Sequence, residues 1–362
     1  MIVIADDITG AAEMAGIAFE KGMDVGLLTE VAAGFDATAG QTATVIATDT
    51  RSMTEAEAAA ETRRIANIIL EGRPSTPIFK KTDSALRGHV VAELRELMQA
   101  TGLHRAVYMP ANPSKGRIIR HGTYYINKVR LHETDFSFDP EFPATTSVLR
   151  ERFPDAEAAG IIMPDAETQE DIEHMAARYD DGKTLFAGAA DLFEILCSKE
   201  CGRRKAEQPL PMVKDGGRLL VCGSTQSRPP KLGIAIAPMP LAIYDGADNL
   251  SLWNTEAYSS EHSLILTIPH THRTGKEAAT HLRSVMAAMV KQLVGERQPA
   301  QLIIEGGATA WATLRALGWK HFRITQQPAP GVVSMQADNG TIVTLKPGSY
   351  PWGATFAPER KL

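Results

Sequence analysis

Short apolar runs alternate with longer amphipathic stretches along the first half of the chain. Apolar runs of strand length occur at 2–5, 25–29, 44–48, 77–81 and 106–109, and helical spacing of apolar residues occurs at 11–21, 55–71 and 90–101. Strands that alternate with helices are typical of a mainly parallel sheet flanked by helices, where ligands bind at the carboxyl ends of the strands. The first half is therefore predicted to be an α/β domain.

The segment from 110 to 154 interrupts this alternation. It is rich in Pro, Gly, aromatic and charged residues, and it is long for a structureless connection inside a compact domain. It is therefore either functional or contains elements that the pattern does not reveal. Strands are predicted again at 161–164 and 185–188, around a helical stretch, and a helix at 191–200.

A second α/β pattern follows a charged, proline-containing segment at 198–217, which is the best candidate for a linker. Strands are predicted at 218–222, 263–268, 301–304, near 332 and at 341–345, with helices at 276–294 and 309–317. We therefore expect two α/β domains, at 1–210 and 215–362, each with a mainly parallel sheet flanked by helices.

Composition narrows the class of protein. The chain has 362 residues, 44% hydrophobic and 22% charged, which suits a globular protein of two domains. A net charge of -5 and a pI near 6.1 offer no basic field for nucleic acid or anionic lipid, so neither is an expected partner.

Targeting and redox signals point to the cytoplasm. The first residues lack the positive charge of a secretory signal, and no apolar run approaches the roughly 18 residues of a membrane span. Three cysteines, at 197, 201 and 222, are too few for a disulfide framework. Cys197 and Cys201 have no further ligand nearby, and His270 and His272 are more typical of a polar loop, so no metal site is predicted.

Two carboxylates and a hydroxyl stand where the first strand ends and a helix begins, in Asp6-Asp7-Ile8-Thr9-Gly10. A carboxylate at this edge is a natural general base for a substrate hydroxyl, and the helix start adds amide donors. The alternative is that Asp7 or Thr9 only caps the helix.

A second polar loop, Lys80 to Gly88, follows another strand and combines two lysines, Asp83, Ser84 and Arg87. Arg87 is suited to hold a carboxylate through two parallel hydrogen bonds, and Lys81 to neutralise that carboxylate or a transferring phosphoryl group. The alternative is a solvated charged turn. Asn112 and Arg117, in the irregular segment, either line the same crevice or are merely exposed to solvent.

Three loops of the second half follow predicted strands and carry glycine next to hydroxyl or basic groups. They are Gly223-Ser224, the run Gly306-Gly307-Ala308-Thr309, and Lys346-Pro347-Gly348. Glycine lets the backbone approach an anion while the amides of a helix start point at it. Loops of this kind on one sheet edge would form a nucleotide site. Gly275-Lys276 lacks the upstream glycine of a Walker loop.

At these motifs the chain resembles the four-carbon acid sugar kinases, which phosphorylate acids such as threonate, erythronate and 3-oxo-tetronate with ATP. Residues 5–11, ADDITGA, are similar to the family's A-D-D-[LF]-T-G-A opening, and residues 81–88, KTDSALRG, are similar to its K-x-D-S-x-L-R-G loop. The resemblance extends over nearly the whole chain, including the 110–143 segment and its LHET run at 131–134.

The resemblance implies an acid-binding first domain, a nucleotide-binding second domain, and an active site in the cleft between them, with ATP and Mg²⁺ as cofactors. The implied catalytic residues are Asp6, Asp7, Lys81 and Asp83. The implied substrate-binding residues are Thr9, Gly10, Ser84, Arg87, Asn112 and Arg117. The implied nucleotide-binding residues are Ser224, Gly306, Gly307, Ala308, Thr309, Gly331, Lys346 and Gly348.

Two residues depart from the family's nucleotide motifs, because Ala308 replaces an acidic residue and Pro347 replaces a serine. These departures keep open a second reading, a non-catalytic sugar-acid sensor with a decayed nucleotide site. A sugar-acid dehydrogenase is less favoured, since no G-x-G-x-x-G follows the first strand. A homodimer is a further open expectation.

Overall fold

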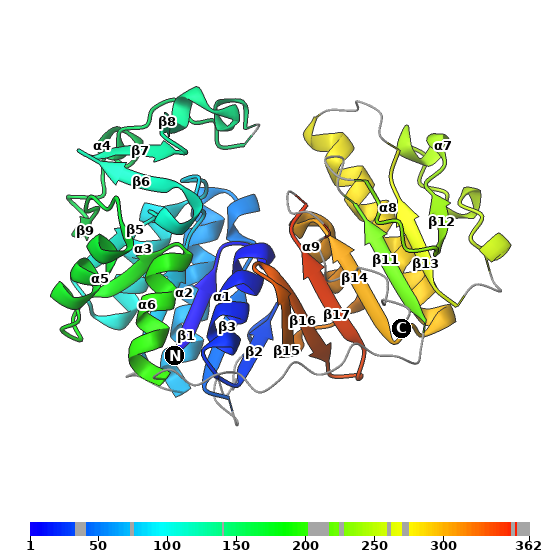
Figure 1. The fold of residues 1–362 in the computed structure, drawn as a ribbon, viewed down its shortest axis with the longest axis horizontal. Helices are drawn as coiled ribbons and strands as arrows, with labels where there is room; N and C mark the ends of the chain where they lie inside the picture. The colour runs from blue at the N-terminus through cyan, green and yellow to red at the C-terminus, as the bar shows by residue number, and fades with distance from the viewer. Residues whose placement is uncertain are drawn as a thin grey trace, which may run out of the picture. The chain divides into compact units, whose positions relative to one another are not determined.

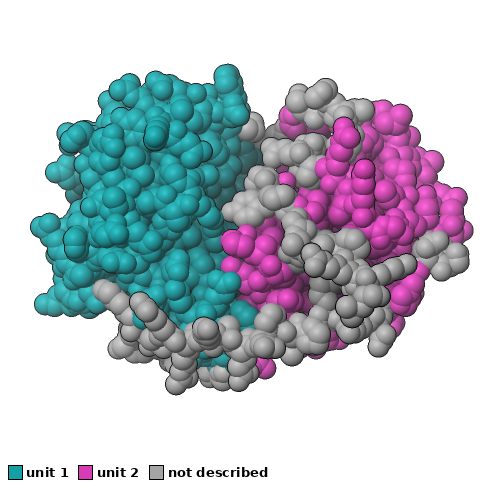
Figure 2. Space-filling model, in the orientation of Figure 1, with its two compact units in different colours: residues 1–206 teal, residues 207–362 magenta. Residues whose placement is uncertain are grey.

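The structure, a computed structural model, describes residues 1–32, 41–72, 76–139, 141–201, 217–223, 228–258, 262–269, 275–348 and 352. They belong to two compact units, residues 1–206 and 207–362, coloured teal and magenta in Figure 2. Among the described residues, no helix combines the length and apolar character needed to cross a membrane.

The first unit is built on a parallel sheet. Its strands are β1 (Ile2–Ala5), β2 (Val25–Leu28), β3 (Ala43–Ala47), β4 (Ile78–Lys81), β5 (Ala106–Met109), β9 (Ile161–Ile162) and β10 (Leu185–Gly188). They pair in the order β2-β3-β1-β4-β10-β5-β9, and neighbouring strands are parallel. The central strand β1 is fully buried, as the continuous apolar run at 2–5 predicts.

Helices cover this sheet (Figure 1). The helices of this unit are α1 (Ile8–Glu20), α2 (Glu55–Gly72), α3 (Val90–Thr101), α4 (Leu149–Arg152), α5 (Gln169–Arg178) and α6 (Ala190–Cys201), of which the short α4 lies beside β7. α2 packs on α3, and both α1 and α5 pack on α6. Local sequence sets their ends: Thr168 and Asp171 form a capping box at α5, and Gly102 closes α3 with a φ of 69°.

The irregular segment at 110–154 contains a small antiparallel sheet that the sequence pattern did not reveal. β6 (Arg117–Arg120), β7 (Thr123–Ile126) and β8 (Val129–Arg130) pair in sequence order. Both connecting turns are two residues long with positive φ throughout: His121-Gly122 at 49° and 67°, and Asn127-Lys128 at 49° and 70°. Such mirror-image turns match the twist of a tight hairpin. The 3-10 turns are η2 (Pro113–Lys115), η3 (Leu131–Glu133) and η4 (Asp135–Phe138).

The second unit has a mixed sheet. Its strands are β11 (Arg218–Cys222), β12 (Ala235–Pro238), β13 (Leu264–Thr267), β14 (Gln301–Glu305), β15 (His321–Ala329), β16 (Val332–Ala337) and β17 (Ile342–Lys346). The run β12-β13-β11-β14-β17 is parallel, while β16 and β15 continue it antiparallel. β12 and β15 were not predicted.

The helices of this unit are α7 (Leu241–Tyr244), α8 (Lys276–Arg297) and α9 (Gly307–Leu317), with 3-10 turns η5 (Leu250–Leu252) and η6 (Glu256–Tyr258). α8 packs on α9. The predicted α/β class with mainly parallel sheets is confirmed. The predicted linker overlaps the end of α6, and its residues 202–216 lie outside the described residues.

Candidate active site

The register of the first sheet brings the predicted acid-site loops to one edge. Ala5 is level with Ala47 on one side and with Lys81 on the other, and Lys81 is level with Gly188. Because the strands are parallel, the loops that follow β1, β3, β4 and β10 all begin at the same edge.

Asp7 acts as the N-cap of α1. Its Oδ1 accepts a hydrogen bond from the backbone N–H of Gly10 at 2.8 Å. A Cβ atom on Gly10 would lie 2.7 Å from that oxygen, so a side chain there would displace the carboxylate. Thr9 occupies the same first turn. Capping does not exclude a second role, because the carboxylate of Asp7 keeps 22% of its surface exposed, against 3% for Asp6.

Arg51, which the sequence analysis missed, organises the carboxylates of this edge. It lies in η1 (Thr50–Ser52), just after β3. Its Nε and one terminal nitrogen each donate to Asp6 at 2.9 Å, and the other terminal nitrogen donates to Asp7 Oδ2 at 3.2 Å and lies 3.6 Å from Asp83. Burial alone would lower the pKa of Arg51, but the three aspartates raise it well above its ordinary value. Arg51 therefore stays charged and offsets part of their mutual repulsion.

Asp83 and Arg87 form a second charged group in the loop after β4. Arg87 donates two hydrogen bonds of 2.9 Å to Asp83 and one of 3.3 Å to Asp139. Burial alone would raise the pKa of Asp83, but Arg51 and Arg87 hold it far below its ordinary value. The guanidinium of Arg87 is thus already engaged by two carboxylates.

The lysines of this loop have separate surroundings. Lys81 Nζ donates to the carbonyl oxygen of Thr82 at 2.8 Å and lies 3.6 Å from Glu13, which also pairs with Lys115. Burial alone would raise the pKa of Glu13, but the two lysines lower it. Lys80 is fully buried and bonds to Glu93 at 2.7 Å. Lys80 is therefore a core residue.

The glutamate that holds Lys80 also anchors the strand end that carries Arg51. Glu93 accepts hydrogen bonds from the hydroxyl of Thr50 at 2.6 Å and from that of Thr62 at 3.3 Å. Thr50 immediately precedes Arg51. The buried Lys80–Glu93 pair therefore fixes the position of Arg51 indirectly.

Arg117 and Ser84 meet beside the same loop. Arg117, at the start of β6, donates to the hydroxyl of Ser84, and its guanidinium lies 5.9 Å from the ring centre of Phe136. Tyr124 ties this loop to the next, because its hydroxyl donates to the carbonyl oxygens of Ser84 at 2.6 Å and Pro110 at 3.1 Å. The irregular segment therefore contributes to the predicted acid site.

Asn112 has a positioning role in this structure. Its side-chain oxygen accepts the backbone N–H of Asp191, near the start of α6, at 3.0 Å, and the side chain is buried. Asp191 in turn accepts from the backbone N–H and hydroxyl of Ser114. These contacts link the loop after β5 to the helix after β10.

The loop after β4 holds Leu86 in a costly backbone conformation. Leu86 is buried with a φ of 62°, and Gly88 has a φ of 93°. A left-handed Leu persists only where its surroundings impose it, and such residues gather at functional sites. Arg152 contributes here by donating to the carbonyl oxygen of Leu86 at 3.3 Å.

In the second unit the register also gathers the predicted nucleotide residues at one edge. Cys222 is level with Glu305, Glu305 with Lys346, and Val333 with Leu345. The β15–β16 turn with Gly331 (φ 76°) therefore lies at the same edge as the loops that follow β11, β14 and β17. Ser224 lies outside the described residues.

The start of α9 is open at this edge. Gly306, with a φ of 93°, occupies its N-cap without a side-chain hydrogen bond, and Ala308 is exposed. The first amides of the helix therefore lack a capping side chain, which is the arrangement that favours an anion. A Cβ on Gly223 would lie 2.8 Å from Cγ2 of Thr309 and closer still to its hydroxyl, so glycine allows these two loops to touch.

Lys346, a predicted nucleotide-binding residue, is engaged inside the unit. It is fully buried, bonds to Glu305 at 2.6 Å and donates to the carbonyl oxygen of Pro347 at 3.0 Å. Its Nζ lies 4.7 Å from the ring centre of Trp352. In this conformation Lys346 orders the loop of Pro347 and Gly348.

Comparison with known proteins supports an acid-binding first half and a nucleotide-binding second half. Residues 1–159 match a family model described as a sugar-binding N-terminal domain, and residues 249–350 match a nucleotide-binding C-terminal domain. The chain is 27% identical to a D-threonate kinase of Salmonella typhimurium, over 98% of this chain and 96% of the relative. It is 24% identical to a 3-oxo-tetronate kinase of Brucella melitensis, over 99% and 95%.

The chain belongs to the four-carbon acid sugar kinase family. As a four-carbon acid sugar kinase it is a phosphotransferase with an alcohol group as acceptor. A solved Haemophilus influenzae protein shares the fold of this kinase, with a TM-score of 0.75 and 20% identity, over 98% of both chains. A solved Salmonella typhimurium protein does so with a TM-score of 0.76 and 20% identity, over 98% of this chain and 97% of the other.

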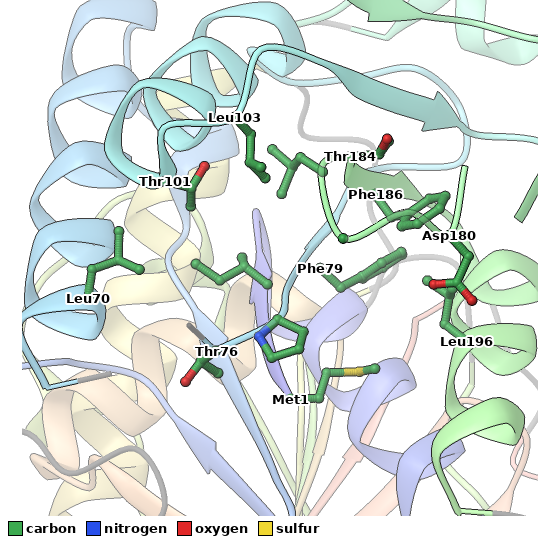
Figure 3. Close-up of a pocket in the computed structure, with 14 residues that line it drawn as sticks. Met1, Leu70, Thr76, Phe79, Thr101, Leu103, Asp180, Thr184, Phe186 and Leu196 are labelled. Carbon is green, nitrogen blue, oxygen red and sulfur yellow. The ribbon is translucent and has the colours of Figure 1, made fainter. Parts of the chain in front are cut away.

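The kinase also has a cavity of about 580 Å³ at the opposite edge of its first sheet (Figure 3). Its lining is mixed, with Phe79, Phe186 and Leu196 beside polar residues such as Thr184 and Asp180. It lies by Met1 and Pro77, before β1 and β4, whereas the predicted acid-site residues follow those strands. This cavity is therefore separate from the candidate acid site.

Proposed function

We propose that this protein is an ATP-dependent kinase that phosphorylates a hydroxyl group of a four-carbon sugar acid of the threonate, erythronate or 3-oxo-tetronate type. The observation that carries this proposal is the edge of the first sheet where Asp6 and Asp7 stand beside a loop rich in basic groups. That edge provides a carboxylate for a hydroxyl and cations for an acid. The nucleotide-binding family model supports the second substrate.

Within this proposal the first domain, 1–210, binds the acid, and Asp7 is the group next to the reacting hydroxyl. Asp6 is almost fully buried and bound by two nitrogens of Arg51, whereas Asp7 is more exposed. Asp7 therefore orients and deprotonates the hydroxyl, and Asp6 keeps Arg51 in place. The aspartates repel the substrate's own carboxylate, which turns toward the basic side chains near Lys81 and Arg87.

The second domain, 215–362, holds ATP in this proposal. The uncapped amides at the start of α9 suit a phosphate, and Gly223 lets the loop after β11 lie against Thr309 in this helix. Reaction requires the acid and the γ-phosphate to meet in line, with water excluded from the reacting groups.

Mg²⁺ fits this scheme as a companion of the nucleotide. Among the described residues no group of three or more His, Cys, Asp or Glu side chains is arranged to hold a metal ion. Mg²⁺ commonly binds one or two carboxylates together with substrate phosphates. Phosphate oxygens of ATP and water would therefore supply most of the ligands of the ion, and the ion would neutralise charge on the phosphates.

Kinetics of three variants test these roles. Asp7→Asn should lower kcat more than it raises KM, because it removes the base but not the binding groups. Asp6→Asn should also lower kcat, through release of Arg51, and Arg87→Ala should raise the KM for the acid. Unchanged kinetics in all three variants would overturn the assignment.

The sensor alternative rests on Ala308 and Pro347, which depart from the family's motifs at the nucleotide edge. Thermal shift with Mg-ATP, Mg-ADP and four-carbon acids, alone and in pairs, separates the two functions, because ligands raise the melting temperature by mass action. A kinase responds to both nucleotide and acid. A sensor responds to an acid and does not respond to millimolar nucleotide.

A further inference from the structure

The basic side chains at the acid-site edge differ in how much of their charge is already neutralised. Arg51 contacts three aspartates, and Arg87 contacts Asp83 and Asp139. Both Lys81 and Lys115 pair with Glu13. A substrate carboxylate binding to any of these cations would have to displace or share an internal carboxylate, which costs part of the binding free energy.

Arg152 is engaged in another way. Its nitrogens donate to the backbone carbonyl oxygens of Leu86, Pro143 and Phe142, at distances from 2.9 to 3.4 Å. Burial lowers the pKa of Arg152. Its donors are therefore spent on holding the loop after β4 against the segment that follows η4.

Arg117 stands apart from this group. Within the described part of the chain its guanidinium contacts two uncharged hydroxyl groups, those of Ser84 and Tyr124, and pairs with no carboxylate. The guanidinium is half-buried, so its charge is not fully screened by water. No carboxylate among the described residues neutralises Arg117, so its charge is available to an acidic ligand.

The position of Arg117 suits a bound acid. Ser84 is the residue after Asp83 in the loop that follows β4, so Arg117 reaches the same loop that approaches Arg51. The ring of Phe136 lies 5.9 Å from Arg117 and 5.6 Å from Arg87. A guanidinium that packs on an aromatic ring keeps its N–H groups at its rim, where they match the two oxygens of a carboxylate.

We propose that Arg117, together with the hydroxyl of Ser84, binds the carboxylate of the substrate acid, and that Arg87 acts instead as a positioning residue that holds Asp83. This assignment rests on the proposed kinase function, and it names the group that selects an acid over an uncharged sugar. Arg117 comes from β6, so the small antiparallel sheet supplies the specificity of the site.

The test compares a four-carbon acid that the wild-type protein binds with the neutral amide of the same acid. Calorimetric binding without nucleotide and steady-state kinetics with ATP are measured for wild type, Arg117→Ala, Arg117→Lys and Arg87→Ala. Arg117→Ala should weaken acid binding about 10- to 100-fold, as expected for loss of a charge-assisted pair. Its preference for acid over amide should fall by the same factor, and Arg117→Lys should restore part of it.

Arg87→Ala is the matched control. It should weaken acid and amide to similar extents, because it acts through Asp83 and not through the carboxylate, and its preference for the acid should persist. Circular dichroism establishes that each variant is folded. A preference that survives in Arg117→Ala and collapses in Arg87→Ala would overturn the proposal.

The two proposals fail in different ways. If wild type binds the acid and forms no ADP, the kinase function fails, while the binding comparison still decides the role of Arg117. If wild type forms ADP and Arg117→Ala discriminates acid from amide as well as wild type, the role of Arg117 fails and the kinase function stands. Binding of acid and amide with equal affinity by wild type would also overturn the role of Arg117.

Discussion

Replacement of Arg51 by Ala should both destabilise the first unit and reduce turnover. Arg51 makes three hydrogen bonds of 2.9 to 3.2 Å with Asp6 and Asp7, and its side chain is 15% exposed. Removing one partner of a buried ion pair typically costs about 3–5 kcal/mol, because the remaining charges are left uncompensated. In Arg51→Ala both Asp6 and Asp7 lose their hydrogen bonds to the guanidinium, and Asp83 loses a nearby cation. We therefore expect the free energy of unfolding of the first unit to fall by an amount in this range.

The assay should report on the first unit alone. All four tryptophans, at 253, 311, 319 and 352, lie in the second unit, so their fluorescence follows that unit. The hydrogen-exchange protection of peptides from β1, β3 and β4 reports on the stability of the first unit. Arg51→Ala should lower the protection of these peptides and shift the tryptophan transition in denaturant much less.

A matched control is Arg63→Ala. Arg63 also donates from two nitrogens to one carboxylate, that of Glu96, but it is 56% exposed and water screens the pair. It should change protection and kcat far less than Arg51→Ala. If the two variants have equal effects on both quantities, the central place given to Arg51 is refuted.

Three further changes test other parts of the structure. The first unit should lose stability as the pH falls below about 4. The folded protein holds the pKa of Asp83 below its unfolded value of 3.8, so the ionised carboxylate contributes stability that is lost as the carboxylate becomes protonated. Hydrogen exchange measured against pH should show a shallower loss of protection in Asp83→Asn than in wild type. Gly223→Ala should cost about 1–3 kcal/mol through overlap with Thr309 and weaken nucleotide binding in calorimetry; unchanged affinity would contradict the proposed loop contact. Lys80→Met should cost about 3–5 kcal/mol in denaturant unfolding, and the added change Glu93→Leu should recover part of it, since both charges are then removed; a double variant less stable than the single one would contradict this.

The strand ends of both sheets could be predicted from the sequence, and this is why the site loops were found. The run at 2–5 is short, apolar and followed by two aspartates, and the run at 77–81 is short and ends in two lysines, so both were predicted as strands that end at a polar loop. Residues after such strands share an edge, whichever helices lie between them.

Arg51 was missed although its position in the sequence offered a signal. It follows the predicted strand at 44–48, and the same strand-end reasoning that selected Asp6 and Lys81 would have selected it. Its importance comes from the pairing of β1 with β3, a contact between segments about forty residues apart in sequence that no local pattern encodes.

The hairpins of β6, β7 and β8 were missed for another reason. His121-Gly122 and Asn127-Lys128 are not among the strongest turn pairs, and the strands between them are at most four residues long. The engaged state of Arg87 and of Lys346 was also beyond sequence reasoning, because their partners Asp139 and Glu305 are brought close only by folding.

The most direct test of the central claim is to follow ADP formation from Mg-ATP with a panel of four-carbon sugar acids and to identify the product by phosphorus NMR. The kinase account predicts ADP formation that depends on one or more of these acids, together with a phosphate ester on a hydroxyl carbon of the acid. Binding of an acid without ADP formation, or ADP accompanied only by inorganic phosphate, would contradict it.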